Sequence, residues 1–324
     1  MLNEKRDFKK SITYKKQYDN DCNAALREYL SQGFVTEHKL RCSDEVDIEQ
    51  IDELHDLPFL SWERTRYKIP MKVASIYHGL GITHYLDRNQ LDESMMAAFS
   101  YGYYHLAVER HRLKLFPLRF GREQEGAMLA ANIFYLPMAF LLGNDKYSKH
   151  IYCALQDWYS KGIILSFNSY FHDLIIALSA RYYGDSIQID SSRIDEAGAF
   201  PYQDVIEYWD SEDLSIVEDL VLKLCDEQVE QVVAPASARY SEFNQIEWRY
   251  FPYMALMLLK LRSNRGLKNP DVNHFAFGNL NELLPSPVED LRLDPLLTSV
   301  VQQMKKQGFD EDEAFSDLTD KYTK

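Results

Sequence analysis

The stretch GAMLAANIFYLPMAFLLGN, residues 126–144, is the longest part of this 324-residue chain without a charged side chain. Its length just reaches that of a membrane-spanning helix, but Asn132 and Pro137 interrupt it and alanine is frequent. We therefore predict a fully buried central helix, kinked at Pro137, that runs through one contiguous core. A membrane span is the alternative for this stretch.

Segments with an apolar repeat of about 3.6 residues lie on both sides of this stretch, as is typical of helices with a buried face. Strand signals are scarce: no run of Val, Ile or Thr alternates with polar residues, and no Asn-Gly or Asp-Gly hairpin turn occurs. We predict an all-α fold of about twelve helices, stacked as antiparallel pairs in a bundle or a solenoid-like array. The predicted helices cover residues 19–32, 47–57, 70–86, 90–115, 122–142, 145–161, 169–183, 202–209, 212–233, 247–265, 294–307 and 311–321.

One helix end and the following helix start carry explicit signals. Gly308 followed by Phe309 predicts a helix end at which the glycine is left-handed and the apolar residue folds back. Asp310 precedes Glu313 by three residues, which resembles a capping box with Asp in place of Ser or Thr. For the whole chain we predict a single helical domain, residues 1–324; the alternative is two subdomains that meet near residues 185–200.

The overall charge excludes several classes of partner. The chain has 36 basic and 50 acidic residues, a net charge of −14 at pH 7. Generic nucleic-acid binding needs a basic surface, and adhesion to an anionic membrane needs one as well, so we expect neither partner. The four cysteines lie far apart without a C-x-x-C motif, which argues against a disulfide framework and favours a reducing cytoplasm.

Signatures of catalysis and of metal binding are absent from the sequence. No phosphate-binding G-x-x-x-x-G-K-[ST], no G-x-S-x-G elbow and no H-E-x-x-H motif occurs. His172-Asp173 on a helix is a conceivable ligand pair, and we predict an ordinary, partly buried histidine beside a carboxylate there instead. The aromatic and basic residues of 101–114 allow a nucleic-acid platform, and we predict a core-lining helix there instead. We therefore expect no catalytic residue, no metal site and no cofactor.

A strongly acidic segment stands out from this background. Residues 185–230 contain 14 acidic and 2 basic residues. Ile216, Leu220, Leu224 and residues 229–233 are predicted to form its buried stripe. Aromatic side chains flanked by one sign of charge suit an interface with a basic protein, whereas the alternative is a solvated acidic helix. The candidate partner-binding residues are Tyr202, Asp204, Glu207, Tyr208, Trp209, Asp210, Glu212 and Asp213.

The last third of the chain contains a more particular series of short motifs. They are EWRYFPY at residues 247–253, LLKLR at 258–262, RGL at 265–267, PDVNH at 270–274, LLP at 283–285 and DPLL at 294–297. This series resembles the closing segment of mostly helical immunity proteins of bacterial polymorphic-toxin systems, in particular the family numbered forty-nine in the immunity series. The resemblance covers about a third of the chain, with a compatible middle segment at residues 169–183.

The resemblance implies a protein without enzymatic activity that neutralises a cognate toxin by binding it. Toxins of such systems are often nucleases, and a basic nuclease selects an acidic inhibitor that occupies its electropositive groove. Two alternatives remain at this point. The chain could be an intracellular helical scaffold or adaptor, or a helical enzyme whose site is assembled from residues distant in sequence.

Overall fold

The structure is a computed structural model of the whole chain, and the description is confined to part of it. The described residues are 10, 13–17, 20, 93–120, 128–129, 133–142, 145–161, 163–165, 170–186, 189, 200–234, 242–243, 246–285, 290–293, 297–298, 301–302, 305 and 308–319. The predicted helices at 19–32, 47–57 and 70–86 lie outside these residues almost entirely.

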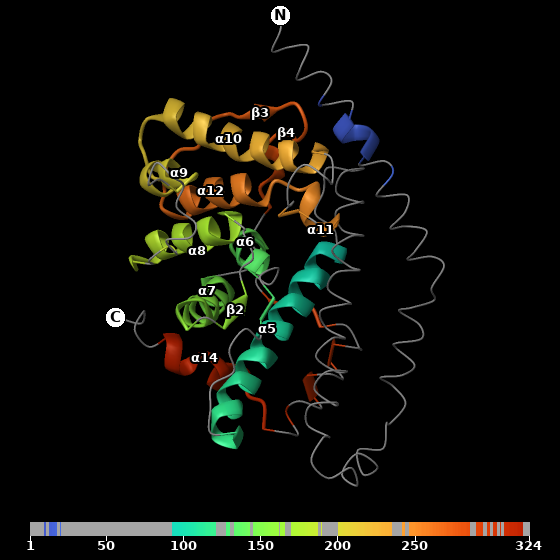
Figure 1. Cartoon of the computed structure of the whole chain (residues 1–324), viewed down its shortest axis with the longest axis vertical. Coiled ribbons are helices and arrows are strands. Elements are labelled where there is room, and N and C mark those ends of the chain that lie inside the picture. Colours follow the sequence, from blue (N-terminus) through green and yellow to red (C-terminus); the bar gives the residue numbers. More distant parts are fainter. Residues whose placement is uncertain are drawn as a thin grey trace, which may run out of the picture.

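The described residues are mainly helical, as predicted: 72% of them are in helices. Nine α-helices, four two-residue strands and one 3-10 helix lie in this part of the chain, and Figure 1 labels the helices and strands. The elements are α5 (Glu93–Phe120), β1 (Met128–Leu129), α6 (Tyr135–Leu142), α7 (Asp145–Ser160), β2 (Ile164–Leu165), α8 (Tyr170–Tyr183), α9 (Gln203–Tyr208), α10 (Leu214–Val233), α11 (Ile246–Arg249), α12 (Tyr253–Asn264), β3 (Asn273–His274), β4 (Gly278–Asn279), the 3-10 helix Asn281–Leu283 and α14 (Glu311–Thr319).

The helices lie in layers. Figure 1 shows α10, α12, α8, α7 and α14 one below the other, with the long helix α5 running along one side. Direct contacts join α10 to α12, α12 to α8, α8 to α7 and α7 to α14, and α5 packs against α6, α7 and α14. The described buried side chains form one hydrophobic cluster that includes residues on both sides of 185–200.

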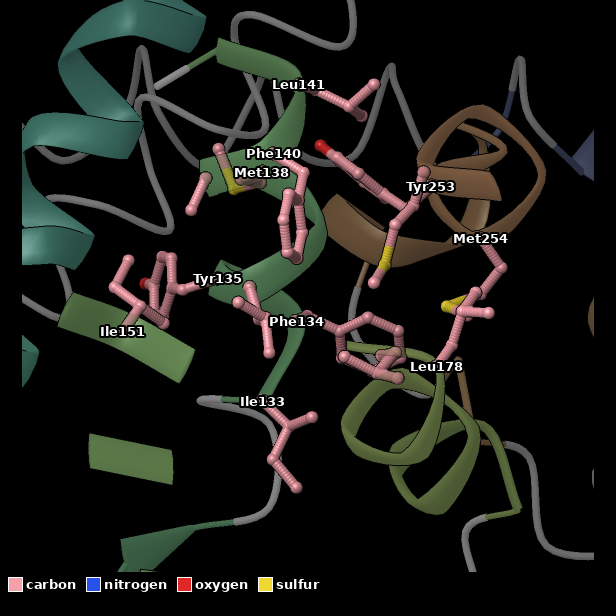
Figure 2. Close-up of a cluster of buried hydrophobic side chains, with 14 of the residues drawn as sticks. Ile133, Phe134, Tyr135, Met138, Phe140, Leu141, Ile151, Leu178, Tyr253 and Met254 are labelled. Atoms are coloured by element: carbon pink, nitrogen blue, oxygen red, sulfur yellow. The ribbon is translucent and has the colours of Figure 1, made fainter. Parts of the chain in front are cut away.

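Helix α6 lies at the centre of this cluster. All eight of its residues, Tyr135 to Leu142, are buried, and α12, α7 and α5 pack around it. Figure 2 shows Leu178 of α8 and Met254 of α12 in the same cluster as the side chains of this helix. No helix among the described residues is both long enough and apolar enough to cross a membrane.

The predicted single helix over 122–142 is wrong in its extent. Residues 128–129 form strand β1, which pairs in parallel with β2 through Met128–Ile164 and Leu129–Leu165. Pro137 does not kink a longer helix, because it lies in the first turn of α6. A proline is tolerated there, since the first backbone N–H groups of a helix have no partner within the helix.

The predicted helix 247–265 is also interrupted. Tyr250, Phe251 and Pro252 separate α11 from α12. The buried amide of Gln228 in α10 donates hydrogen bonds from Nε2 to the carbonyl oxygens of Trp248, Arg249 and Phe251, at 3.3, 2.9 and 2.9 Å. One side chain of a neighbouring helix therefore satisfies carbonyl groups that the break leaves without a helical partner.

Close packing and helix capping follow the sequence at other places. Gly102 of α5 lies directly against the ring of Tyr135. A Cβ atom at position 102 would be only 2.1 Å from this ring, so no larger residue fits there. Gly308 has a φ of 86°, and Asp310 Oδ1 accepts a hydrogen bond of 2.8 Å from the backbone N–H of Glu313. The predicted left-handed glycine and the predicted aspartate cap are thus confirmed.

Replacement of a side chain in α6 should abolish folding. Leu141 is 1% exposed, so Leu141→Asp would bury a carboxylate without a partner, at a cost of several kcal/mol against a total stability of about 5–15 kcal/mol. We expect the variant to be insoluble or to lack a cooperative thermal transition. The matched variant Leu214→Asp, at a 37% exposed position, should keep that transition; a soluble, cooperatively folding Leu141→Asp protein would contradict the assignment of α6 to the core.

Candidate functional site

The most distinctive described surface surrounds the turn between α9 and α10. Residues 200–234 contain ten carboxylates and a single basic residue, Lys223. Helix α10 is amphipathic, with one buried face that packs on α12. Helix α9 is a short helix between α8 and α10, and it contacts both. The segment therefore turns most of its charge to solvent.

The eight predicted partner-binding residues fall into three groups: two buried aromatic residues, one carboxylate paired within the protein and five exposed residues. Tyr202 and Trp209 are 3% and 4% exposed and belong to the hydrophobic core. The ring of Tyr202 packs against Phe171 of α8, and the Trp209 ring lies 6.2 Å from that of Tyr182. These two rings are therefore structural, and as buried side chains they are not available as anchors for a partner.

Asp204 is already engaged within the protein. Lys223 Nζ lies 2.8 Å from both of its carboxylate oxygens. The same ammonium donates to the carbonyl oxygen of Pro201 at 2.8 Å and lies 5.6 Å from the centre of the Tyr202 ring. This pair ties α10 to the start of α9, so Asp204 contributes less free charge to the surface than the sequence suggested.

The other five predicted residues, Glu207, Tyr208, Asp210, Glu212 and Asp213, are exposed. Asp213 also begins α10, because its Oδ1 accepts a hydrogen bond of 2.9 Å from the backbone N–H of Ser215. The hydroxyl of Ser215 donates to the same oxygen at 2.7 Å, and these hydrogen bonds lower the pKa of the Asp213 carboxyl. Asp213 is thus negatively charged and held in place at the N-terminus of α10.

Two apolar residues of this surface were not identified from the sequence. Leu214 and Ile216 are each 37% exposed, and Tyr208 is 49% exposed. The prediction that Ile216 belongs to the buried stripe of α10 is wrong; Val217, Leu220, Val221 and further residues to Val232 form that stripe. We call the exposed residues of this region the acidic α9–α10 surface: Glu207, Tyr208, Asp210, Glu212, Asp213, Leu214, Ile216, Glu218 and Asp219.

A buried arginine holds this turn in place. Arg262 of α12 is 1% exposed, and its guanidinium donates to the carbonyl oxygens of Trp209, Ser211 and Lys268 at 2.7, 2.8 and 2.6 Å. A further hydrogen bond of 3.3 Å reaches Asn269 Oδ1. Burial lowers the pKa of Arg262, and the nearby charge of Asp210 opposes that shift. The conformation of residues 209–211 therefore depends on a side chain far away in the sequence.

A cleft opens beside the acidic α9–α10 surface. It has a volume of about 490 Å³ and lies where the end of α8, α9 and the segment after α12 meet. Two carboxylates and two guanidinium groups line it, together with three apolar side chains. Its lining residues are Arg181, Ile206, Glu207, Trp209, Asp210, Arg265 and Leu267.

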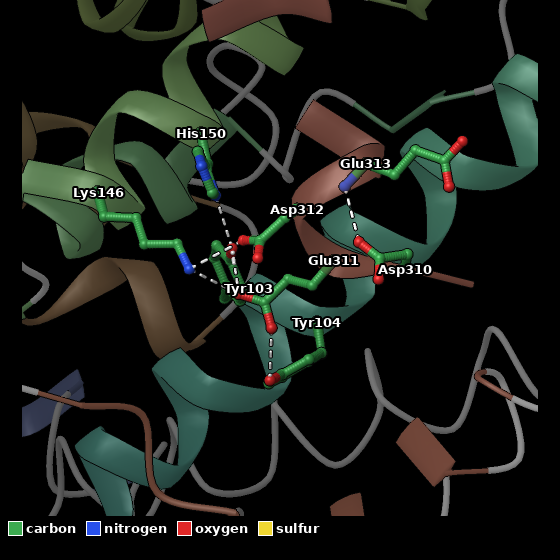
Figure 3. A network of polar contacts seen from close by, with 8 residues as sticks. All are labelled: Tyr103, Tyr104, Lys146, His150, Asp310, Glu311, Asp312 and Glu313. Carbon is green, nitrogen blue, oxygen red and sulfur yellow. Dashed lines mark hydrogen bonds and ion pairs between the residues drawn. The ribbon is translucent and has the colours of Figure 1, made fainter. Parts of the chain in front are cut away.

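A second polar cluster, shown in Figure 3, joins α14 to α5 and α7. Glu311 accepts hydrogen bonds from the hydroxyl groups of Tyr103 and Tyr104, at 3.0 and 2.9 Å. The Tyr103 oxygen also lies 2.8 Å from His150 Nδ1. Because the single hydroxyl proton of Tyr103 goes to the carboxylate, His150 must donate from Nδ1 to the tyrosine oxygen. Lys146 adds ion pairs of 3.6 Å to Glu311 and 3.1 Å to Asp312.

The protonation states of this cluster fit a structural role. Burial, reinforced by the charge of Glu311, raises the pKa of Tyr103 and of Tyr104, so that both hydroxyls remain donors. Burial lowers the pKa of His150 to about 4, and the positive charge of Lys146 acts in the same direction. The imidazole ring stacks on Phe315 of α14 with a centroid distance of 4.5 Å. A neutral His150 therefore completes the packing of α14.

The remaining sequence candidates lie in the core. His172 and Asp173 are buried in α8, and the Tyr159 hydroxyl donates a 2.6 Å hydrogen bond to Asp173 Oδ1. Tyr101, like Tyr103 and Tyr104, is buried in α5, which is the predicted core-lining helix. Within the described part of the chain, no group of three or more His, Cys, Asp or Glu side chains is arranged to hold a metal ion.

The motifs behind the resemblance also lie mostly in the core. Trp248 stacks on Phe134 with a centroid distance of 4.8 Å, and Tyr250, Phe251 and Tyr253 are buried. Comparison with models of protein families, with curated proteins and with solved structures finds no match. The class that the described residues define is therefore a mainly helical protein with an acidic, partly apolar exposed surface.

Removal of the Arg262 guanidinium should destabilise the α9–α10 turn. Arg262→Met would leave buried carbonyl groups without donors, and we expect a loss of roughly 3 kcal/mol in the free energy of unfolding. Chemical denaturation measures this change. The matched variant Arg265→Met removes an exposed guanidinium from the end of the same helix, and it should cost less than about 1 kcal/mol. Equal losses in both variants would contradict the anchoring role of Arg262.

The packing of His150 predicts a dependence of stability on pH. Its pKa is about 4 in the folded protein and near 6.5 when unfolded, so the unfolded chain binds more protons between these values. Stability is therefore full above pH 6.5 and falls as the pH drops towards 4. Denaturation at pH 7 and at pH 4.5 measures the fall in the free energy of unfolding, which should be smaller in His150→Phe by roughly 2 kcal/mol.

The control for this prediction is Lys161→Gln, which removes an exposed ion pair with Asp157 at the other end of α7. This variant should keep the full pH dependence of the unmodified protein, because it removes no titrating imidazole. A His150→Phe protein with an unchanged pH dependence would show that other groups cause the fall.

Proposed function

We propose that this protein binds a basic protein partner through the acidic α9–α10 surface, and that the partner is a toxin which it neutralises by stoichiometric binding. The observation that carries the proposal is the composition of this surface, in which exposed apolar side chains lie among carboxylates. The resemblance of the last third of the chain to immunity proteins supports the same function. We place its action in the cytoplasm, in line with the spacing of the cysteines.

The charge of the surface supports recognition of a basic partner. Six of its nine residues are carboxylates, namely Glu207, Asp210, Glu212, Asp213, Glu218 and Asp219. A field of one sign attracts a partner of the opposite sign and increases the rate of encounter. A nuclease toxin carries a positive groove for its phosphate backbone substrate, so an acidic protein of this kind competes for that groove.

The exposed apolar residues of the surface support the proposal that a stable complex forms after the initial encounter. Tyr208, Leu214 and Ile216 account for three of the six exposed large hydrophobic residues in the described part of the chain. They lie within nine positions of one another on both sides of the α9–α10 turn. Tyrosine is enriched in the central contacts of interfaces, where water is excluded. These residues provide the dry part of the proposed interface, and the carboxylates provide its rim.

The proposal is tested with the product of the gene adjacent to this one. Purified protein should co-purify with that product and should protect a susceptible cell or substrate at one equivalent. Protection at far below one equivalent would replace the proposal with an enzymatic antidote. Absence of any complex and of protection would leave the scaffold alternative as the better description.

Charge reversal on the acidic α9–α10 surface should slow association with the partner. Glu212→Lys with Asp219→Lys changes two exposed carboxylates outside the cleft, so we expect a lower association rate that is most evident at low salt. Surface binding kinetics at several salt concentrations measure this effect. The matched control is Glu282→Lys with Asp290→Lys, an equal reversal at exposed sites elsewhere. Equal association rates for both double variants would contradict binding by the acidic α9–α10 surface.

Truncation of the apolar residues should instead affect dissociation. Tyr208→Ala and Ile216→Ser should each accelerate dissociation by roughly tenfold or more, which corresponds to about 1.4 kcal/mol or more. Each variant must keep the thermal midpoint of the unmodified protein. Phe275→Ala, at a 43% exposed position on the β3–β4 turn, is the matched control and should dissociate at the unmodified rate.

A further inference from the structure

The charges of the cleft beside α9 are arranged in an unusual way. Arg181 and Arg265 bring positive charge to it from the ends of α8 and α12. Glu207 of α9 and Asp210, in the turn that follows α9, bring negative charge. No hydrogen bond or ion pair joins either guanidinium to either carboxylate. Two opposite pairs of charges therefore face one open space of about 490 Å³ without neutralising one another.

Two of these groups have no hydrogen-bond or ion-pair partner among the described residues, and the other two are held in place. Arg181 and Asp210 make no hydrogen bond or ion pair with any described residue. Arg265 donates a hydrogen bond to the carbonyl oxygen of Tyr182, and its guanidinium lies 5.1 Å from the centre of the Tyr182 ring. Glu207 accepts a hydrogen bond of 2.7 Å from Gln203 Nε2. Both signs of charge are thus partly positioned before a ligand arrives.

The rest of the lining is apolar and comes from well-packed residues. Ile206 and Trp209 are buried, and Leu267 is half-buried. The carbonyl of Trp209 is one of the acceptors of Arg262, so this part of the cleft is tied to α12. A volume of about 490 Å³ lies within the range of small-ligand sites, about 300–1,000 Å³. The cleft therefore has a mainly polar lining, with a positive end, a negative end and a smaller apolar part.

We propose that this cleft binds a basic α-amino acid with a free carboxylate, of the arginine or lysine class, either free or as the last residue of a peptide. The ligand carboxylate pairs with Arg181 and Arg265, since guanidinium groups bind carboxylates with two parallel hydrogen bonds. The cationic side chain pairs with Glu207 and Asp210, which lie three positions apart at the end of α9. The methylene groups of the ligand lie against the smaller apolar part of the lining, which includes Leu267.

This site does not depend on the proposed function. The ligand is a small molecule recognised by both signs of charge, whereas the proposed toxin interface uses the negative charges and the exposed apolar residues. The two sites share Glu207 and Asp210, so a bound amino acid would alter the charge that faces the partner. Binding of the amino acid is measurable on the protein alone, without any partner.

Calorimetric titration of the full chain with L-arginine tests the proposal. We expect one saturable site, and binding at least tenfold weaker for agmatine, which lacks the carboxylate, and for L-norvaline, which lacks the cationic group. Gly-Gly-Arg with a free C-terminus distinguishes the two sources. A site that accepts the last residue of a peptide binds this tripeptide, whereas a site for the free amino acid does not. Absence of saturable heat for both L-arginine and Gly-Gly-Arg at ligand concentrations up to about 10 mM overturns the proposal.

Two variants locate the site. Arg181→Gln and Asp210→Asn should each weaken the binding of L-arginine, or of Gly-Gly-Arg if that is the ligand, at least tenfold. Their matched controls are Lys305→Gln and Asp290→Asn, which change exposed charges outside the cleft lining and should bind as the unmodified protein does. All four proteins must keep the unmodified thermal midpoint. Unchanged binding in both cleft variants, or agmatine binding as tightly as L-arginine, would show that the cleft is not this site.

Discussion

The complete burial of α6 is the constraint on which the rest of the described structure depends. This helix has no polar face, so it is stable only where apolar side chains cover it on every side. Helices α5, α7 and α12 supply that cover. The contact with α5 is close enough that position 102 has no room for a side chain beyond hydrogen. The layers outside this centre, including α8, α10 and α14, pack on the helices that cover α6.

The helices that periodicity predicted well are those whose ends and faces are set locally. Helix α7 was predicted at 145–161 and spans Asp145–Ser160, and the start of α14 follows from the aspartate that caps it. The predicted helix over 122–142 failed because strand β1 depends on a partner at Ile164–Leu165, which no local pattern reveals. The break before α12 likewise depends on a distant residue, because Gln228 of α10 donates a hydrogen bond to a carbonyl oxygen at the break. Local chemistry is visible in a sequence, whereas distant pairing is not.

The candidate surface shows the same division. The density of carboxylates around α9 and α10 is a property of composition, and the structure leaves most of them exposed. The burial of Trp209 depends on α12, whose Arg262 binds the main chain of the turn from a distance. Ile216 shares a helical face with Leu220, but it lies in the first turn of α10, where the cover of that face ends. Periodicity predicts which face of a helix is buried, but it does not predict how much of that face the neighbouring helices cover.

The burial of α6 also has a consequence for synthesis on the ribosome. Its cover comes partly from α12, which lies far downstream in the chain. At about 5–20 residues per second, on the order of ten seconds separate the emergence of the two helices. During that interval the part of the α6 surface that α12 covers in the folded protein lacks this cover. Transiently exposed apolar surface of this kind favours chaperone binding and aggregation, so the interval before α12 emerges is the stage of synthesis at which we expect this chain to be most vulnerable.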